Sequence, residues 1–117
     1  MGRLSTHVLD TMHGCPAAGM KVTLQRIHGT HAQAVVSHWL NADGRAPGPL
    51  LEGDTMDPGR YCLLFEVGSY FRERGVALPD PAFLETVRID FGIADPAAHY
   101  HVPLLTSPWA YSTYRGS

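Results

Sequence analysis

Charge is scarce in this sequence of 117 residues. Only 17% of the residues are charged and the formal net charge is -2, whereas an average soluble domain is roughly 25% charged. So weak and balanced a charge gives no broad basic field, which argues against a nucleic-acid partner. It also leaves much of the surface uncharged, and we expect another subunit to cover part of that surface.

Long apolar runs are missing as well. No stretch approaches the eighteen or so apolar residues that a membrane-spanning helix needs. The first residues pass directly into an alternating pattern, without the apolar core of a signal peptide. We therefore expect a cytoplasmic protein with no membrane partner.

Cysteine is rare, with Cys15 and Cys62 the two in the chain. They lack the C-x-x-C spacing and the density of a disulfide scaffold, so two reduced, partly buried thiols are the simplest interpretation. A bridge or a reactive thiol is the alternative. Zinc motifs such as H-E-x-x-H are absent too, so the seven histidines alone do not predict a bound metal.

Short segments with strand character fill the chain instead. Its 117 residues suit a single domain, 1–117, large enough to bury about two-thirds of the surface that the unfolded chain exposes. Alternating apolar and polar residues predict strands, and glycine- and proline-rich turns separate them. The expected strands are 4–11, 20–27, 34–40, 60–67, 83–91 and a pair within 99–114, with a short edge strand near 50–51.

One segment favours a helix. Residues 68–75 suit about two helical turns ended by Gly75, and residues 93–98 are expected to form a hairpin connection. Many short strands with one short helix predict an all-β fold, a two-sheet β-sandwich. The flat outer face of a sandwich binds small ligands poorly, so we expect a site to form between subunits, where two such faces oppose each other.

Polar side chains gather on the last pair of predicted strands. Because side chains alternate along a strand, His99 and His101 share one face, and Ser112 and Tyr114 share a face of the next strand. His7 lies within the first predicted strand, among small or apolar neighbours. From position alone, a structural role is the simpler interpretation of each side chain.

Several motifs together resemble a known family. They are Leu4-Ser-Thr-His-Val-Leu-Asp-Thr11, Gly14-Cys-Pro-Ala17, Asp43-Gly-Arg45, Phe65-Glu-Val-Gly-Ser-Tyr-Phe71, Tyr100-His-Val-Pro-Leu-Leu105 and Tyr111-Ser-Thr-Tyr-Arg-Gly-Ser117. Across the whole chain the sequence is similar to the transthyretin-related 5-hydroxyisourate hydrolases of purine breakdown. The final Tyr-Arg-Gly-Ser is the most specific motif, because it separates these hydrolases from the transthyretin hormone carriers.

The resemblance implies a transthyretin-like Greek-key sandwich, assembled as a homotetramer with active sites in a channel between dimers. It implies hydrolysis of the small molecule 5-hydroxyisourate at its N1–C6 amide bond to 2-oxo-4-hydroxy-4-carboxy-5-ureidoimidazoline, with no cofactor and no metal. The implied catalytic residues are His7, Arg45 and His101. The implied substrate-binding residues are Ser112, Tyr114, Arg115, Gly116 and Ser117.

The chemistry of these side chains fits that reaction. A neutral imidazole, with an ordinary pKa near 6.5, can take the proton that water loses as it attacks a carbonyl. We expect His7 and His101 to share this task, and the sequence does not show which is the base. Arg45 can hold a substrate oxygen or stabilise the charge that develops on the carbonyl. Two nearby imidazoles titrate as a coupled pair, so acid should lower the activity.

Two other functions stay open. A transthyretin-like carrier would bind an aromatic ligand in the same channel without turnover, although a carrier channel should be lined by aliphatic groups rather than by His7, Arg45 and His101. A structural or metal-storing domain rests on the histidine count alone. Decay of the ultraviolet band of fresh 5-hydroxyisourate distinguishes the enzyme from the carrier, and loss of stability with a chelator would favour metal storage.

Overall fold

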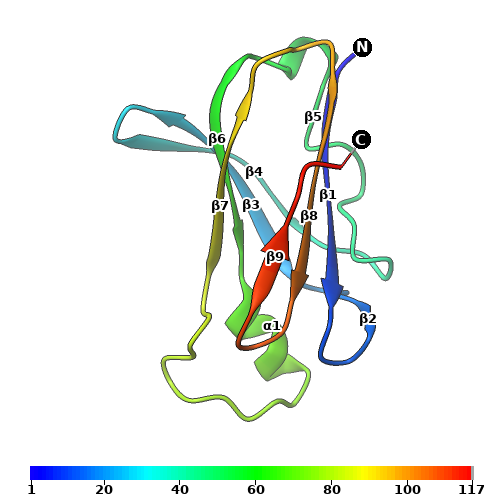
Figure 1. The fold of residues 1–117 in the computed structure, drawn as a ribbon, viewed down its shortest axis with the longest axis vertical. Coiled ribbons are helices and arrows are strands. Elements are labelled where there is room, and N and C mark those ends of the chain that lie inside the picture. The colour runs from blue at the N-terminus through cyan, green and yellow to red at the C-terminus, as the bar shows by residue number, and fades with distance from the viewer. Residues whose placement is uncertain (117) are drawn as a thin grey trace.

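Two β-sheets pack face to face in the computed structural model, which describes residues 1–116 (Figure 1). The first sheet has the order β2-β1-β8-β9, with β5 paired to the start of β1, and the second has the order β4-β3-β6-β7. The first sheet comprises β1 (Arg3–Asp10), β2 (Cys15–Pro16), β5 (Leu51–Glu52), β8 (His99–Thr106) and β9 (Tyr111–Thr113). The second comprises β3 (Lys21–His28), β4 (His31–Trp39), β6 (Gly59–Phe65) and β7 (Val87–Ile93). The prediction of a two-sheet sandwich is confirmed.

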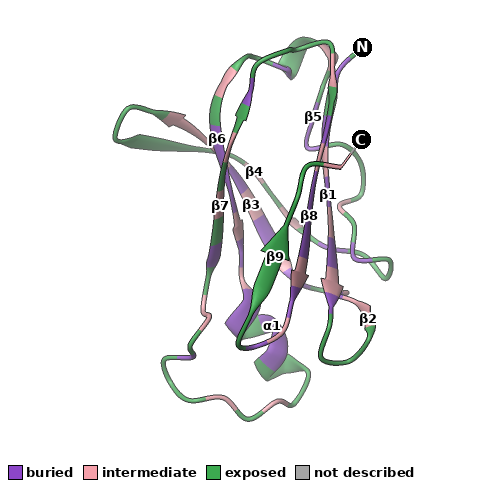
Figure 2. Cartoon of the chain, viewed as in Figure 1, coloured by how far each residue is buried: buried purple, intermediate pink, exposed green. Residues whose placement is uncertain are grey.

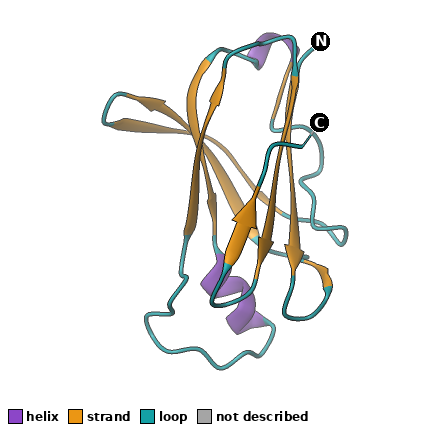
Figure 3. Ribbon diagram, in the orientation of Figure 1, coloured by secondary structure: helices purple, strands orange, loops and turns teal. Residues whose placement is uncertain are grey.

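Helix α1 (Val67–Glu73) closes one end of the sandwich (Figure 3). It buries Val67, Tyr70 and Phe71, the spacing of one apolar helix face, and Gly75 follows it with a positive φ of 83°. The predicted helix 68–75 is thus confirmed to within two residues. A single 3-10 turn, η1 (Gly53–Thr55), follows β5. None of the helices within residues 1–116 is long and apolar enough to cross a membrane.

The core lies between the two sheets, and β1 shows how the sequence builds it. Its even-numbered residues face the core, and its odd-numbered residues face outward (Figure 2). The buried set is Leu4, Thr6, Val8 and Asp10, and the outward set is Arg3, Ser5, His7 and Leu9. On the opposite sheet, β6 buries Leu63 and Phe65 completely, as expected for the strand with the strongest apolar run.

The central pair of the first sheet is parallel. Strands β1 and β8 pair in register along their whole length, with Ser5 opposite His101 and His7 opposite Pro103. Because alternate residues of both strands face the same way, the outward faces of β1 and β8 form one surface. This pairing joins segments from near the two ends of the described chain.

The predicted strand 83–91 is wrong in its first half, since β7 begins at Val87. Residues just before it are tied to α1 instead of the sheet. The Glu85 carboxylate accepts bonds from Arg72 at 2.8 and 3.0 Å and from the Ala82 amide at 2.9 Å. Phe83 is 70% exposed and its ring centroid lies 6.0 Å from that of Trp109.

The hairpin connection expected at 93–98 is also wrong. Residues 94–98 carry the chain from β7 in the second sheet to β8 in the first, so the two strands do not pair. The Tyr100 hydroxyl shapes this crossover by accepting bonds from the amides of Ala94 and Asp95 at 3.1 and 2.9 Å. Alternation within each strand gives no information about which sheet the next strand joins.

A buried carboxylate ties β1 to α1. Asp10 is 1% exposed and accepts bonds from the His13 amide at 2.9 Å, the His13 Nδ1 at 2.6 Å and the Tyr70 hydroxyl at 2.8 Å. Burial raises the pKa of Asp10, but the bonds from His13 and Tyr70 outweigh it, so the net pKa lies below its ordinary value. Both cysteines are free, as predicted.

Candidate active site

Strands β1 and β8 place His101 beside Ser5 on the outer face of the first sheet. The imidazole is half-buried, and its Nδ1 lies 2.8 Å from the Ser5 Oγ. Burial lowers the pKa of His101 below its ordinary 6.5, and the positive charge of Arg45 and the neighbouring His7 imidazole lower it further. The ring is therefore neutral at neutral pH and able to accept a proton.

His7 lies on the same outer face of the first sheet, two residues after Ser5 along β1. Its Nε2 donates a hydrogen bond of 2.9 Å to the carbonyl oxygen of Asp43. Because a carbonyl oxygen only accepts, Nε2 carries the proton, and the lone pair of the neutral ring is on Nδ1. The turn that carries Arg45 thus fixes the tautomer of His7.

Arg45 reaches this face through a turn docked on β1. The turn is closed by the Asn41 side chain, whose oxygen accepts the Arg45 amide at 3.1 Å, and Arg45 forms a β-bridge with His7. Gly44 has a φ of 73°, and its carbonyl oxygen accepts a hydrogen bond of 2.9 Å from the Val8 amide. A Cβ at Gly44 would lie 2.5 Å from the Val8 oxygen, so only glycine lets the turn approach this closely.

A hollow of about 290 Å³ opens on this face. Its walls are Arg3, Ser5, Arg45, His99, Tyr100 and His101. No acidic side chain of the described residues lines it, so guanidinium and imidazole groups favour a small ligand that is anionic or rich in carbonyl oxygens. His7 is not a wall residue and lies beside Arg45, next to the hollow. The three predicted catalytic residues are therefore brought to one face.

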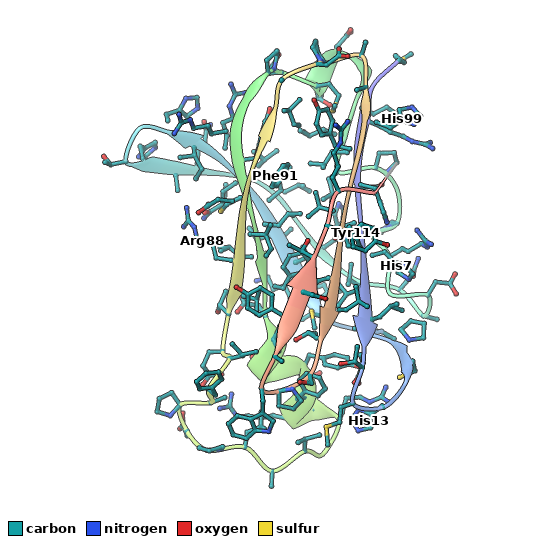
Figure 4. All side chains as sticks on the ribbon, in the orientation of Figure 1. His7, His13, Arg88, Phe91, His99 and Tyr114 are labelled. Atoms are coloured by element: carbon teal, nitrogen blue, oxygen red, sulfur yellow. The ribbon has the colours of Figure 1, made fainter. Side chains whose placement is uncertain are left out.

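Ser112 and Tyr114 are on this face but not in the hollow. Ser112 pairs with Leu105, four residues along β8 from His101, which corresponds to roughly 13 Å at about 3.3 Å per residue. Tyr114 is 62% exposed and lies near the middle of the same sheet as His7 (Figure 4). Both side chains are free to meet a ligand or a second subunit.

Arg115 and Gly116 contact β8 instead of the hollow. The Arg115 guanidinium lies 4.2 Å above the Tyr100 ring centroid and donates to the His99 carbonyl at 3.2 Å. The Gly116 amide donates to the His101 carbonyl at 2.8 Å. Arg115 and Tyr114 also line a separate groove of about 450 Å³ between the two sheets. Ser117 lies outside the described residues.

Four wall residues of the hollow are not among the site residues predicted from the sequence: Arg3, Ser5, His99 and Tyr100. Alternation did place Ser5 on the face of His7, and His99 on the face of His101. What the sequence could not give is the parallel register of β1 and β8, which sets Ser5 opposite His101. Within residues 1–116, no three Cys, His, Asp or Glu side chains come together as a metal site requires.

The fold and the site define a β-sandwich that binds a small molecule beside acid–base groups. The chain belongs to the HIUase/Transthyretin family, whose model matches residues 4–116. It is 54% identical over 117 residues to a Pseudomonas aeruginosa protein named 5-hydroxyisourate hydrolase, and the match covers 100% of this chain and 93% of that relative.

Two solved structures share the fold over nearly the whole chain. One is the structure of Klebsiella pneumoniae 5-hydroxyisourate hydrolase, with 37% identity, a TM-score of 0.82 and full coverage of both chains. The other is the crystal structure of (S)-allantoin synthase, with 45% identity and a TM-score of 0.93. That match covers 99% of this chain and 44% of the synthase chain, so this chain corresponds to less than half of the synthase.

Proposed function

We propose that this protein is a 5-hydroxyisourate hydrolase of urate degradation, which opens the six-membered ring of its substrate at the N1–C6 amide bond. One observation carries the proposal: a neutral imidazole, His101, lies with Arg45 in the wall of a hollow that has no acidic side chain among the described residues. The family membership and the names of the relatives support it independently.

The reaction is an addition followed by an elimination. His101 takes a proton from water through Nε2 while the water oxygen bonds to C6, and Arg45 stabilises the oxygen that becomes negative. When the N1–C6 bond breaks, the proton passes to N1, so water is divided between a new carboxylic acid and an N–H group, and the acid then releases its proton to solvent as it becomes a carboxylate. His7, with its Nδ1 lone pair, orients the water or serves as a second base. Ser112 and Tyr114 orient the ring.

The proposed assembly is a homotetramer in which two copies oppose their first sheets. Half-buried Leu9 and Leu105 and the exposed Tyr114 give this face an apolar component that a second copy can cover. Within one chain Ser112 is too far along β8 to touch a ligand beside His101. A facing copy can bring its own Ser112 to the hollow, which completes the site between subunits.

A carrier function is disfavoured by the same wall residues. Arg3, Arg45 and two imidazoles surround the hollow, whereas a carrier of a largely apolar aromatic ligand needs aliphatic walls. The polar groups of the site have a direct use in hydrolysis and none in retaining an apolar ligand.

The test is spectroscopic. Fresh 5-hydroxyisourate, generated from urate by urate oxidase, is mixed with the protein, and the decay of its ultraviolet band is compared with the spontaneous decay. The hydrolase accelerates the decay in proportion to protein concentration. If the folded protein binds the compound in calorimetry but leaves the decay rate unchanged, the carrier function replaces this proposal.

A further inference from the structure

His101 is held from two sides by residues that no proposed step uses. On one side, Ser5 of β1 presents its hydroxyl to Nδ1 at 2.8 Å. On the other side, the Gly116 backbone runs along the imidazole and its amide bonds the His101 carbonyl at 2.8 Å. The His101 ring therefore lies between the Ser5 hydroxyl on one side and Gly116, which has no side chain, on the other.

The space at Gly116 is what allows this arrangement. A Cβ built there would lie 2.8 Å from Cδ2, 3.1 Å from Cβ and 3.3 Å from Cγ of His101. Gly116 is not among the glycines with positive φ, so its backbone is open to any residue. The imidazole, and not the backbone conformation, is what excludes a side chain at this position.

Arg115 keeps this segment in place. Its guanidinium stacks on the Tyr100 ring at 4.2 Å and donates to the His99 carbonyl at 3.2 Å. Arg115 and Gly116, which we call the strap, thus contact three consecutive residues of β8, ending at His101. A stacked, hydrogen-bonded guanidinium restrains the chain beside it, so Gly116 cannot easily move away from the ring.

Ser5 contacts one nitrogen of the His101 ring and leaves the other nitrogen open. The bond at 2.8 Å involves Nδ1, and Nε2 has no hydrogen-bond partner among the described residues. If Nδ1 carries the proton and Ser5 Oγ accepts it, Nε2 keeps the lone pair that removal of a proton from water requires. The opposite tautomer places a proton on Nε2 and cannot act as a base there.

We infer that Ser5 and Gly116 are positioning residues, which hold the His101 imidazole in one orientation and in the Nδ1–H tautomer with Nε2 free for water. The kinetic part of this inference rests on the proposed hydrolase function, whereas the orientation and tautomer of the ring do not. The strap residues thereby act through His101 and not by binding substrate themselves.

The first test is made without substrate. Ring ¹⁵N shifts of His101 report its tautomer, and we expect the Nδ1–H form in the unmodified protein at pH 8. Ser5→Ala shifts the ring toward the Nε2–H form, and Ser5→Thr, which keeps a hydroxyl, restores Nδ1–H. Gly116→Ala displaces the ring signals because its new methyl group meets Cδ2.

Two controls match these variants. Ser37→Ala removes another strand hydroxyl, which lies 2.9 Å from that of Thr23 in the other sheet. Gly48→Ala adds a methyl group where no atom of residues 1–116 lies within 4 Å and φ is not positive. Neither control should change the His101 signals or the turnover.

The second test is turnover of 5-hydroxyisourate. Losing a hydrogen bond that orients a catalytic side chain costs about 10-fold in kcat with an unchanged KM, so we expect that for Ser5→Ala and recovery with Ser5→Thr. Displacing the ring by Gly116→Ala costs on the order of 100-fold. Ser5→Ala could instead raise KM and leave both kcat and the His101 ring signals unaltered. That result would show that Ser5 binds substrate directly, and it would overturn the inference.

The outcomes separate this inference from the proposed function. If the unmodified protein does not turn over 5-hydroxyisourate, the hydrolase proposal fails, and the ring shifts still decide whether Ser5 and Gly116 position His101. If both variants fold and keep the ring signals and kcat of the parent, the inference is wrong. If Gly116→Ala does not fold, the comparison of Ser5→Ala with Ser5→Thr tests the inference without it.

Discussion

The His101 ring is the side chain on which the proposed chemistry depends most. Replacing it by Asn keeps a polar group of similar width but removes the base, so kcat should fall by about 10²–10⁴-fold with a smaller change in KM. Stopped-flow decay of 5-hydroxyisourate measures both constants. His31→Asn, at an exposed position beside the β3–β4 turn, is the control and should keep full activity.

The pH dependence of turnover follows from the same residue. Burial, Arg45 and His7 lower the pKa of His101 below 6.5, so the neutral ring is the major form at pH 6.5 and the protonated ring becomes the major form only in more acidic solution. Activity should therefore persist through pH 6.5 and fall below it, which a profile of kcat/KM against pH measures. A profile that already falls on passing from pH 8 to pH 7 contradicts this assignment.

Arg45 should influence that titration directly. Its positive charge disfavours the imidazolium form, so Arg45→Gln should raise the pKa of His101 toward 6.5. Titration of the His101 ring by NMR follows this change without any substrate. An unchanged or lower pKa in the variant would mean that Arg45 does not face His101 in solution.

At the scale of single residues, the sequence predicted the polar face but not its contacts. Alternation and the family motifs identified His7, Arg45 and His101, and the structure gathers them on one face. The parallel register that sets Ser5 beside His101 depends on how distant strands pair, which no local pattern encodes. The family resemblance implies that Arg115 binds substrate, and no local pattern indicates that its guanidinium stacks on Tyr100.

At the scale of elements, the buried carboxylate of Asp10 links β1 to α1. Asp10→Asn weakens its bonds to His13 and Tyr70, and the loss of charge-assisted bonds to a buried group costs about 2–3 kcal/mol. Urea denaturation at pH 7 measures this loss. Asp90→Asn is the control, because Asp90 is 67% exposed in its pair with Arg88 and such pairs contribute below about 1 kcal/mol.

Acid should remove the same stabilisation. The folded-state pKa of Asp10 lies below 3.8, so its contribution is complete above the unfolded-state pKa, near 3.9, and is lost as the pH falls through the lower folded-state pKa. The stability difference between the parent and Asp10→Asn should therefore shrink in that acidic range. A difference that stays constant from pH 7 to pH 2 would contradict the role of the charge.

The elements themselves were largely predictable, and their connections were not. Strong alternation predicted β1, β3 and β8, and an apolar run predicted β6, because these patterns report burial on one face or both. The segment 83–86 alternates too, but the Glu85 carboxylate binds Arg72 of α1 and keeps that segment out of the sheet. Whether this segment joins the sheet thus depends on a side-chain contact with a distant segment, which alternation does not reveal.

At the scale of the whole molecule, the proposed homotetramer should have a mass near four times 12.8 kDa. Leu105→Asp places a charge on the outer face of β8, where a second copy is expected, and should give a smaller mass in light scattering. Activity should fall with it, since Ser112 then loses access to the hollow of a facing copy. Val35→Asp, on the 43% exposed surface of β4, should leave the mass unchanged.

The central claim is that two imidazoles and a guanidinium hydrolyse 5-hydroxyisourate. The most direct measurement is the decay of its ultraviolet band with the parent protein, with Arg45→Gln and with the double variant His7→Asn, His101→Asn, all at equal concentration and checked for folding. The parent should accelerate the decay, Arg45→Gln should retain a small part of that acceleration, and the double variant should decay at the spontaneous rate. A folded double variant that matches the parent would contradict the claim.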